Sequence, residues 1–278
     1  MTLGSDAPVP DLSRSDLFRA GSGDPFLARL LAAHPEVRGG FPTDHPGIAF
    51  GRRVDRYVGP DLSGGAARVL DGVGGDARGG EGRSGPGLPF GLIEHMDNNP
   101  LVCADLARVP SAAQTLVLVA LGPLLKTGLI LEPPAITIDI ECDEDEIVEA
   151  LRTEDPGTES VTLSVGPSVH PSVRRLHAVV AVRNPRSLDE FDEAYAERYD
   201  RALYVRRREE NEFSPENVAD RPWAEFILRI SPGDDASLLA ISAIADLRGK
   251  LGQAQVVHTM NVMAGFEESL GIPELLPH

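Results

Sequence analysis

The chain is short of basic residues and of long apolar runs. Lysine and arginine together number 26 against 43 aspartate and glutamate residues, which gives a formal net charge of −17. Because nucleic acids and anionic membrane surfaces are polyanions, this charge disfavours both as partners. No apolar run in the sequence approaches the length of a membrane-spanning helix. We therefore expect neither a nucleic-acid partner nor a membrane partner.

Cysteine is also scarce. The two cysteines, Cys103 and Cys142, are too few for a disulfide framework, and they are not spaced as metal ligands, so we expect no metal site. The first residues lack the basic start and apolar core of a secretory signal. A reducing cytoplasm is therefore the expected setting. The remaining composition, 42% hydrophobic and 25% charged, is that of an ordinary globular protein.

Two apolar segments near the C-terminus predict a strand followed by a helix. Ser237 to Ile244 reads SLLAISAI, a compact run suited to a buried strand. Further on, apolar residues recur at the spacing of one helix face, and the helix should stop near Gly265. The residues that carry this spacing are Ala254, Val257, Met260 and Ala264.

A capped helix is also predicted near the N-terminus. Asp24 and Pro25 supply an N-cap and a first-turn proline, and His34-Pro35 should close the helix. The ten residues before the glycines of this segment, DLSRSDLFRA, predict only a poor buried strand. We expect no clear strands between Phe41 and Pro89, a flexible glycine-rich loop over 72–88, and a disordered tail over 1–15.

The second half of the chain predicts an α+β unit with an antiparallel or mixed sheet. Ser111 and Gln114 have the spacing of a capping box, and the helix that they open should run to Gly128 with a kink at Pro123. A second helix is expected from Ser187 to Asp200. Strands are predicted at Ala135–Ile140, Val161–Val165, Leu176–Arg183, Leu203–Arg207 and Glu225–Ile230.

The C-terminal residue order resembles that of N-acetyl-gamma-glutamyl-phosphate reductases. Two more segments are similar to this family: AGSGDPFLARLLAAHPEV from Ala20 matches a glycine loop and first helix, and QTLVLVALGPLLKTGLI from Gln114 matches a central helix. The C-terminal resemblance lies in Asp246, Lys250, Gln255, Met260, Asn261, Met263, Gly265, Phe266, Glu268 and Gly271.

The resemblance implies a fold of the class α/β plus α+β. Residues 16–110 together with 245–278 would form a truncated Rossmann-like dinucleotide-binding domain. Residues 111–244 would form a mixed-sheet α+β domain of the catalytic and oligomerisation type.

Members of this family reduce an acyl phosphate to a semialdehyde with NADPH. A cysteine thiolate attacks the acyl phosphate, and a histidine assists proton transfer. The resemblance therefore implies NADPH as cofactor, with Gly21 and Gly23 in the phosphate loop and Asn261 near the nicotinamide. It also places Arg174 at the family's arginine, where Arg174 or the adjacent Arg175 either contacts an anionic substrate or is simply solvated.

The chain departs from the family at each chemical position. The nucleophile position is Ala112, beside Ser111, and the histidine positions are Glu141 and Asp143. Asp24 stands where the third glycine of the loop would fall, and its charge would repel a phosphate. For Ser111 we favour a capping role. For the acids we favour an interaction with the helix dipole over a role as general base.

The remaining chemical side chains have plain structural interpretations. We expect Cys103 and Cys142 to be non-catalytic, and His170 is displaced from the family's histidine. His258 is expected to be a helix residue with a partner. The run Arg206–Arg208 precedes two glutamates and predicts a balanced surface.

Two functional hypotheses from different classes stay open, beside a resemblance of fold alone. The first is a catalytically inactive scaffold or partner subunit, forming a homo-oligomer or a hetero-oligomer with a biosynthetic enzyme, since family members assemble through their C-terminal sheets. The second is an enzyme with altered chemistry on an amino-acid-derived acyl phosphate or related small acid, with Asp143 or Glu141 as base and Arg174 as a substrate contact.

Overall fold

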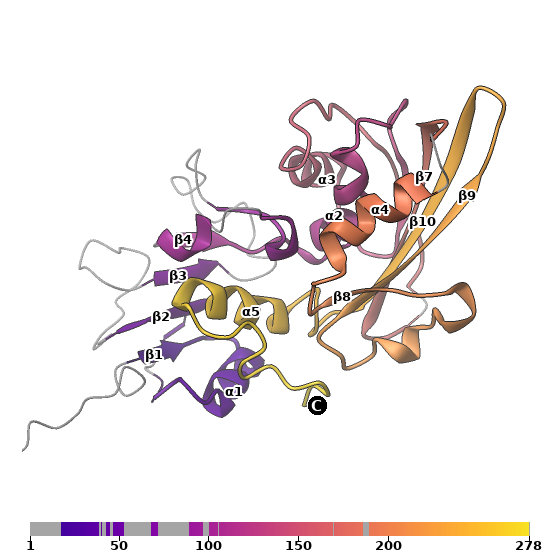
Figure 1. Cartoon of the computed structure of the whole chain (residues 1–278). Coiled ribbons are helices and arrows are strands. Elements are labelled where there is room, and N and C mark those ends of the chain that lie inside the picture. The colour runs from indigo at the N-terminus through magenta and orange to yellow at the C-terminus, as the bar shows by residue number, and fades with distance from the viewer. Residues whose placement is uncertain are drawn as a thin grey trace, which may run out of the picture.

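The strands of the chain form two sheets. The computed structural model describes residues 18–38, 40, 43–44, 47–52, 68–71, 89–96, 100–104, 106–168, 170–185 and 189–277. Within these residues one sheet has four strands in the order β1-β2-β3-β4, and the other has six in the order β6-β5-β7-β10-β9-β8 (Figure 1). The predicted tail, the glycine-rich loop and the Ser187 cap lie outside the described residues.

The four-stranded sheet is mixed. Its strands are β1 (Phe18–Gly21), β2 (Ile48–Arg52), β3 (Arg68–Asp71) and β4 (Leu106–Arg108). The β1–β2 and β2–β3 pairs are antiparallel, and the β3–β4 pair is parallel. The expectation of no clear strands between Phe41 and Pro89 is therefore wrong.

The prediction of a poor strand before the first helix is also wrong, because the support for β1 comes from distant residues. Phe18 is buried and its ring packs 4.7 Å from that of Phe266 and 5.8 Å from that of Phe50. Residues 48–50 of β2 are fully buried beside it. Apolar burial of this kind stabilises a short strand whose own composition is weak.

Two helices cover the four-stranded sheet. Helix α1 (Pro25–Ala33) and helix α5 (Gln253–Ala264) share one apolar core with β1 and β2, which joins the C-terminal helix to the N-terminal part of the chain. Both helices are as predicted. Gly265 ends α5 at φ 73°, a left-handed conformation that glycine adopts without strain.

The six-stranded sheet is mixed, as predicted. The β5–β6 and β8–β9 pairs are parallel, and β7 pairs antiparallel with both β5 and β10. The β9–β10 pair is antiparallel. The strands are β5 (Ala135–Ile138), β6 (Thr162–Val165), β7 (Val173–Arg183), β8 (Val205–Arg207), β9 (Ala224–Ser231) and β10 (Ala236–Asp246).

Three helices pack on one face of this sheet (Figure 1). They are α2 (Ala112–Leu125), α3 (Glu144–Leu151) and α4 (Asp189–Tyr199). Almost every residue of α2 is buried, because α3, α4 and the sheet surround it. Short 3₁₀ turns complete the chain: η2 (Ile93–His95), η3 (Pro100–Cys103), η4 (Glu210–Glu212) and η5 (Pro215–Asn217). The predicted α/β plus α+β class is confirmed, and the arrangement is compatible with a Rossmann-like α+β fold.

Candidate functional site

The N-terminus of α1 is occupied by the chain's own carboxylate. Asp24 Oδ1 accepts hydrogen bonds from the backbone N–H groups of Phe26 and Leu27 at 2.9 and 2.7 Å. Gln253 Nε2 at the start of α5 lies 3.5 Å from the second carboxylate oxygen. These N–H groups are the ones that would bind a phosphate at a helix N-terminus. The loop is therefore arranged for a structural cap.

The two glycines of this loop serve the packing of the chain itself. Gly21 ends β1. A Cβ atom on Gly23 would lie 2.6 Å from the backbone carbonyl carbon of Asp44, so glycine is needed for this close approach. The missing side chain of Gly23 thus makes room for residue 44.

The N-terminus of α2, where the resemblance places the nucleophile, is closed by α3. Ser111 forms the predicted capping box with Gln114. The Ser111 hydroxyl also donates to Glu146 Oε1 at 2.5 Å, and Gln114 Nε2 donates to Glu149 Oε2 at 3.3 Å. Two α3 carboxylates therefore lie against this helix end, and Ala112 brings no reactive group to it.

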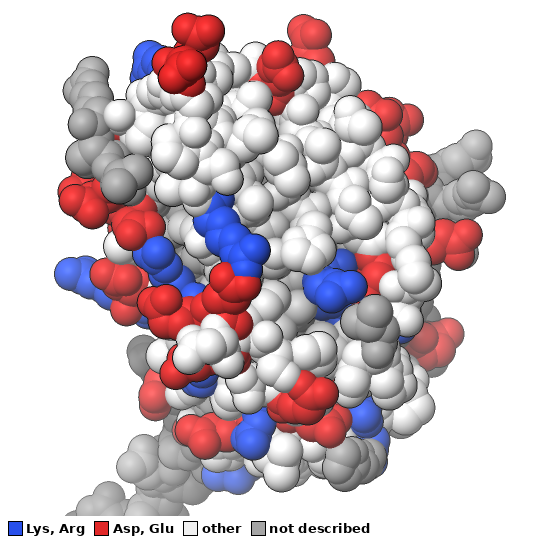
Figure 2. All heavy atoms as spheres, turned by 90° about the vertical axis from the view of Figure 1, so that its right-hand side faces the viewer, with Lys and Arg blue, Asp and Glu red and all other residues white. Residues whose placement is uncertain are grey.

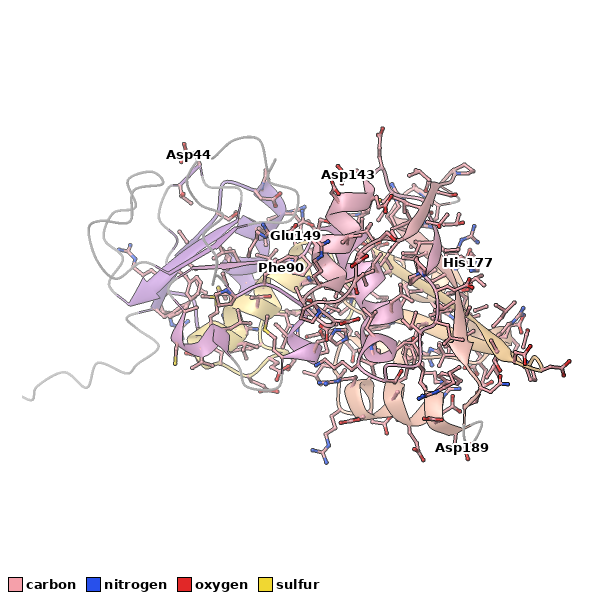
Figure 3. The ribbon with its side chains drawn as sticks, turned by 90° about the horizontal axis from the view of Figure 1, so that it is seen from above. Asp44, Phe90, Asp143, Glu149, His177 and Asp189 are labelled. Atoms are coloured by element: carbon pink, nitrogen blue, oxygen red, sulfur yellow. The ribbon has the colours of Figure 1, made fainter. Side chains whose placement is uncertain are left out.

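Glu149 is held in turn by the strand that precedes α2. Arg108 Nη2 lies 2.6 Å from Glu149 Oε1, and its guanidinium lies 4.3 Å from the centre of the Phe90 ring. Figure 3 shows Glu149 and Phe90 close together between the two sheets. The negative charge beside α2 is thus compensated from within the chain.

The two acids at the histidine positions are exposed. Asp143 caps α3, and its Oδ1 accepts from the backbone N–H of Glu146 at 2.8 Å. Glu141 lies on the exposed loop before the cap. Three further acids fill the first turn of α3, where they favour the helix dipole. This placement agrees with the dipole interpretation and gives neither acid the buried setting of a tuned general base.

Neither cysteine is placed as an activated nucleophile. Burial, together with the negative charges of Glu146 and Asp143, raises the pKa of Cys142 to about 11, so its thiol stays protonated at neutral pH. Cys103 is exposed at the end of η3 and away from the α2 N-terminus in the sequence.

Arg174 is engaged locally. Its Nη1 donates to the His170 carbonyl at 2.9 Å and to the Ser168 hydroxyl at 3.0 Å. His170 Nδ1 in turn accepts from the backbone N–H of Val173 at 3.1 Å. These contacts shape the turn that enters β7. Arg175 uses its backbone N–H to bind Asp139 at 2.6 Å.

Asn261 is a buried connector. Its Oδ1 lies 2.9 Å from His34 Nε2, and its Nδ2 donates to the carbonyls of Glu268 and Leu270 at 3.0 and 2.7 Å. With no exposed area and its polar atoms bonded, Asn261 ties α5 to the end of α1.

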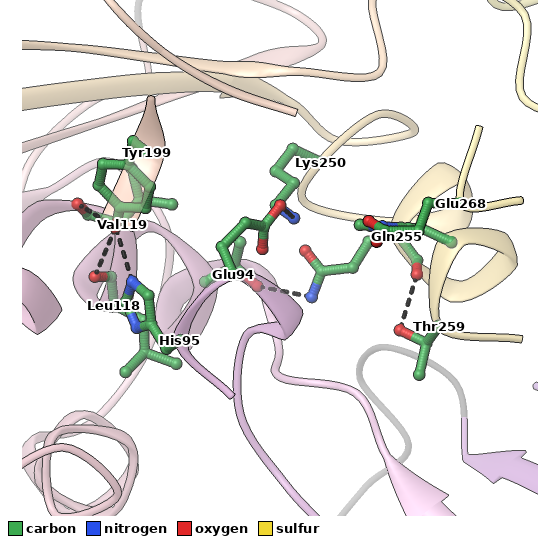
Figure 4. A network of polar contacts seen from close by, with 11 residues as sticks. Glu94, His95, Leu118, Val119, Tyr199, Lys250, Gln255, Thr259 and Glu268 are labelled. Atoms are coloured by element: carbon green, nitrogen blue, oxygen red, sulfur yellow. Dashed lines mark hydrogen bonds and ion pairs between the residues drawn. The ribbon is translucent and has the colours of Figure 1, made fainter. Parts of the chain in front are cut away.

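A buried ion pair, which the sequence did not suggest, joins the two halves of the chain. Lys250 Nζ lies 2.6 Å from Glu94 Oε1, and the two side chains are 1% and 4% exposed (Figure 4). Burial by itself opposes ionisation of Glu94. The charges of Lys250 and His258 outweigh it and lower the Glu94 pKa to about 2. Lys250 is one of the C-terminal residues that resemble the family, but only the fold shows that it meets Glu94.

The pair is surrounded by further polar contacts at the same junction. Gln255 Nε2 donates to the Thr115 hydroxyl at 3.2 Å, and His258 Nε2 lies 2.8 Å from Glu268 Oε2. His258 therefore has the partner that was expected of it. One oxygen of Glu94, Gln255 Oε1 and His258 Nδ1 are buried without a hydrogen-bond partner among the described residues.

A second buried cluster lies behind α2. His95 Nδ1 is 3.0 Å from Glu154 Oε1, and its Nε2 is 2.7 Å from the Tyr199 hydroxyl (Figure 4). The Tyr199 hydroxyl donates to the carbonyl of Val119 at 3.0 Å. A Cβ on Gly122 would lie 2.3 Å from the His95 ring, so the glycine admits the imidazole. These contacts fix the position of α2.

Neither a metal site nor a membrane-spanning helix is found in the part of the chain that the structure describes. There, no three histidine, cysteine, aspartate or glutamate side chains come together as a metal site would need. Nor does any helix within the described ranges have the length and apolar character to span a membrane.

Comparison with known proteins agrees with the residue order noted in the sequence. The chain is 34% identical over 122 residues to the N-acetyl-gamma-glutamyl-phosphate reductase of Archaeoglobus fulgidus. It is 24% identical over 217 residues to the enzyme of the same name from Listeria innocua. The chain resembles N-acetyl-gamma-glutamyl-phosphate reductases. No family model matches the chain.

The resemblance to these reductases is partial in extent. The matches take in 42% and 66% of this chain. They span 35% of the Archaeoglobus reductase and 61% of the Listeria reductase. The chain is thus reductase-like over only part of each relative's length.

Proposed function

We propose that this protein is a catalytically inactive relative of N-acetyl-gamma-glutamyl-phosphate reductases that acts as a scaffold or partner subunit. One observation carries the proposal: carboxylates of the chain lie against both helix N-termini that reduction would need. Asp24 caps α1, and Glu146 accepts from the cap of α2. Oriented N–H groups with positive dipole ends are what an incoming phosphate requires.

The residues at the α1 loop do not fit the phosphates of NADPH. A phosphate there would meet the Asp24 carboxylate, and Gly23 is packed against the backbone of Asp44. No chemical step through the cofactor is therefore assigned to this chain.

The α2 end lacks the groups for acyl transfer. Covalent catalysis needs a nucleophile with an adjacent base or a lowered pKa. Ser111 faces Glu146, but it already serves as the helix cap, and the first turn of α2 also carries the Gln114 contact to α3. The Cys142 thiol, with its raised pKa, is not a substitute.

The outer face of the six-stranded sheet is the surface that we propose for association. The register places Val179 opposite Ala240 and Leu238 opposite Ala181, all on the face away from α2. Val179 and Leu238 are 45% and 51% exposed. Figure 2 shows this side of the molecule, where a broad uncharged area is bordered by both acidic and basic side chains. An exposed apolar area rimmed by polar residues is typical of an interaction site.

The proposal is tested by cofactor binding and turnover. Purified protein is titrated with NADPH to millimolar concentration while nicotinamide fluorescence is followed, and NADPH oxidation is measured with an acyl phosphate. We expect neither saturable binding nor turnover. Turnover that Asp143→Asn or Glu141→Gln abolishes would overturn the proposal and favour the altered-chemistry enzyme.

Association is tested separately by light scattering after size-exclusion chromatography. We expect the chain to form a homo-oligomer, or a hetero-oligomer when mixed with an active reductase, and we expect Leu238→Asp to abolish assembly. Leu275→Asp, at an equally exposed position outside the sheets, is the matched control. If the unmodified chain is a monomer both alone and when mixed with an active reductase, the partner role is contradicted.

A further inference from the structure

A cavity of about 530 Å³ lies beside the edge strand β8 of the six-stranded sheet. Its volume is within the range of small-molecule sites, about 300–1,000 Å³. It is formed where the chain leaves β8, passes through η4 and η5 and enters β9. None of the residues at the N-termini of α1 and α2 lines it. The lining residues are Arg208, Glu212, Glu216, Asn217, Arg221 and Trp223.

Two arginines lie against the indole of Trp223, and a third, Arg208, lines the same cavity. The guanidinium carbon of Arg206 lies 3.7 Å from the ring centre, and that of Arg221 lies 5.5 Å from it. Burial and the positive charge of Arg208 lower the pKa of Arg206, with the charges of Glu225 and Glu274 opposing the shift and Arg221 adding a smaller contribution to it. In a chain of net charge −17, such a concentration of like charge is favourable for binding an anionic group.

The run Arg206–Arg208, expected to be a balanced surface, has partners of three kinds. Arg206 stacks on Trp223, whereas Arg207 pairs with Asp192 on α4 at 2.9 Å. Arg208 Nε binds Oε1 of the fully buried Glu225 at 2.8 Å. This bond uses only one nitrogen of the Arg208 guanidinium, so its forked end is available to a carboxylate.

The floor of the cavity has unused hydrogen-bonding capacity. The indole Nε1–H of Trp223 is buried without a partner within the described residues, although Trp223 itself lines the cavity. The second carboxylate oxygen of Glu225, whose first oxygen binds Arg208, is also buried without a hydrogen-bond partner among the described residues. Buried polar groups are normally satisfied, so the indole N–H beside this cavity is a hydrogen-bond donor for which the described residues supply no acceptor.

The rim of the cavity carries the opposite charge. Glu212 and Glu216 are exposed and line the same cavity as Arg208 and Arg221. Glu216 accepts a hydrogen bond from Ser214, and the Glu212 carbonyl accepts from Asn217 Nδ2 at 2.6 Å. These acids would repel a polyanion such as phosphate, and they would attract an ammonium group.

We propose that this cavity binds a small zwitterion, an α-amino acid. The ligand carboxylate would meet Arg208 and Arg221, and its ammonium group would meet Glu212 and Glu216. The flat face or edge of Trp223 would contact the ligand's side chain. This site is independent of the proposed scaffold role, because it shares no residue with the α1 and α2 helix ends.

The test uses Trp223 as its own reporter, because it is the only tryptophan in the chain. Tryptophan fluorescence of the full-length protein is followed while each common L-α-amino acid, other than tryptophan and tyrosine, is added to about 10 mM, well above a millimolar Kd. We expect a saturable change with at least one amino acid, checked by calorimetry. The N-acetyl derivative and the carboxamide of that amino acid should each bind at least about tenfold more weakly, since each lacks one charge.

A matched pair of variants tests the rim. Glu212→Gln with Glu216→Gln should weaken binding at least about tenfold. Glu193→Gln with Glu197→Gln makes the same change of charge on the exposed side of α4 and should leave the Kd unaltered. Circular dichroism and melting curves verify that both variants fold.

Three results would overturn the proposal. They are no saturable response to any amino acid, equal binding of the N-acetyl derivative or of inorganic phosphate, and an unchanged Kd in the Glu212→Gln, Glu216→Gln variant. Because binding is measured directly, reductase activity or its absence does not affect the outcome.

Discussion

Replacing Lys250 by methionine should remove the most strongly buried positive charge at the junction of the two sheets. Lys250 is 1% exposed and its Nζ lies 2.6 Å from Glu94, so Lys250→Met leaves a buried carboxylate without its counter-charge. Removing one partner of a buried pair costs about 3–5 kcal/mol. At about 2–4 °C per kcal/mol for a chain near this size, the melting temperature should fall by about 6–20 °C.

The same pair predicts that the free energy of unfolding depends on pH. The folded-state pKa of Glu94, about 2, is lower than its ordinary value of 4.5. A carboxyl group whose pKa is lower in the folded state stabilises the fold at any pH above its unfolded-state pKa. This contribution is lost as the pH falls from 4.5 toward 2. The difference corresponds to about 3 kcal/mol. Lys250→Met should remove most of this dependence, as measured by urea unfolding across that pH range.

The control for Lys250→Met is Arg207→Met, which breaks an exposed pair with Asp192. Those side chains are 44% and 48% exposed, and such pairs contribute about 0–1 kcal/mol. The double variant Glu94→Gln, Lys250→Met should regain much of the loss, because no unpaired charge remains. If Lys250→Met melts no lower than Arg207→Met, the reasoning about the buried pair is refuted.

Three further predictions concern separate features. Asp24→Ala should lower the free energy of unfolding by about 1 kcal/mol because the α1 cap is lost, whereas Asp24→Asn keeps a capping oxygen and should lose much less. Equal losses for the two variants in chemical denaturation would contradict the capping role of Asp24. At pH 8 the Cys142 thiol, with a pKa of about 11, is only about 0.1% thiolate. Mass spectrometry after treatment with iodoacetamide should therefore find the exposed Cys103 labelled first. Faster labelling of Cys142 would disprove the environment assigned to its thiol. Gly122→Ala should destabilise the chain by about 1–3 kcal/mol because the new Cβ would overlap the His95 ring. The control Gly157→Ala, in an exposed turn, should change stability by no more than about 0.5 kcal/mol. Similar melting temperatures for the two variants would argue against the packing of His95 on Gly122.

Local signals predicted most of the helices and the second sheet. The capping residues Asp24 and Ser111 and the terminal Gly265 all act within a few residues of their own backbone, so their roles can be read from sequence spacing. The alternation in Ala135–Ile138 likewise reflects one buried face of a strand. The strands β1 and β2 escaped prediction because their side chains are buried against residues far away in the sequence.

Residue order supports only an expectation about the candidate site. The resemblance implies Ala112 at the nucleophile position and acids at the histidine positions, because such an expectation needs only a match of residue order. What lies against each helix end depends on contacts between elements. Ser111 and Glu146 are 35 positions apart in the sequence, and Glu94 and Lys250 are 156 positions apart.

What the sequence by itself determined, then, is most of the helices, the caps Asp24 and Ser111, and the resemblance, since each depends on neighbouring residues or on residue order. The tertiary structure decided that α3 closes the end of α2, that a buried ion pair joins Glu94 to Lys250, and that Arg206 and Arg221 lie against Trp223. Those facts rest on electrostatic and packing contacts between segments that only folding brings together.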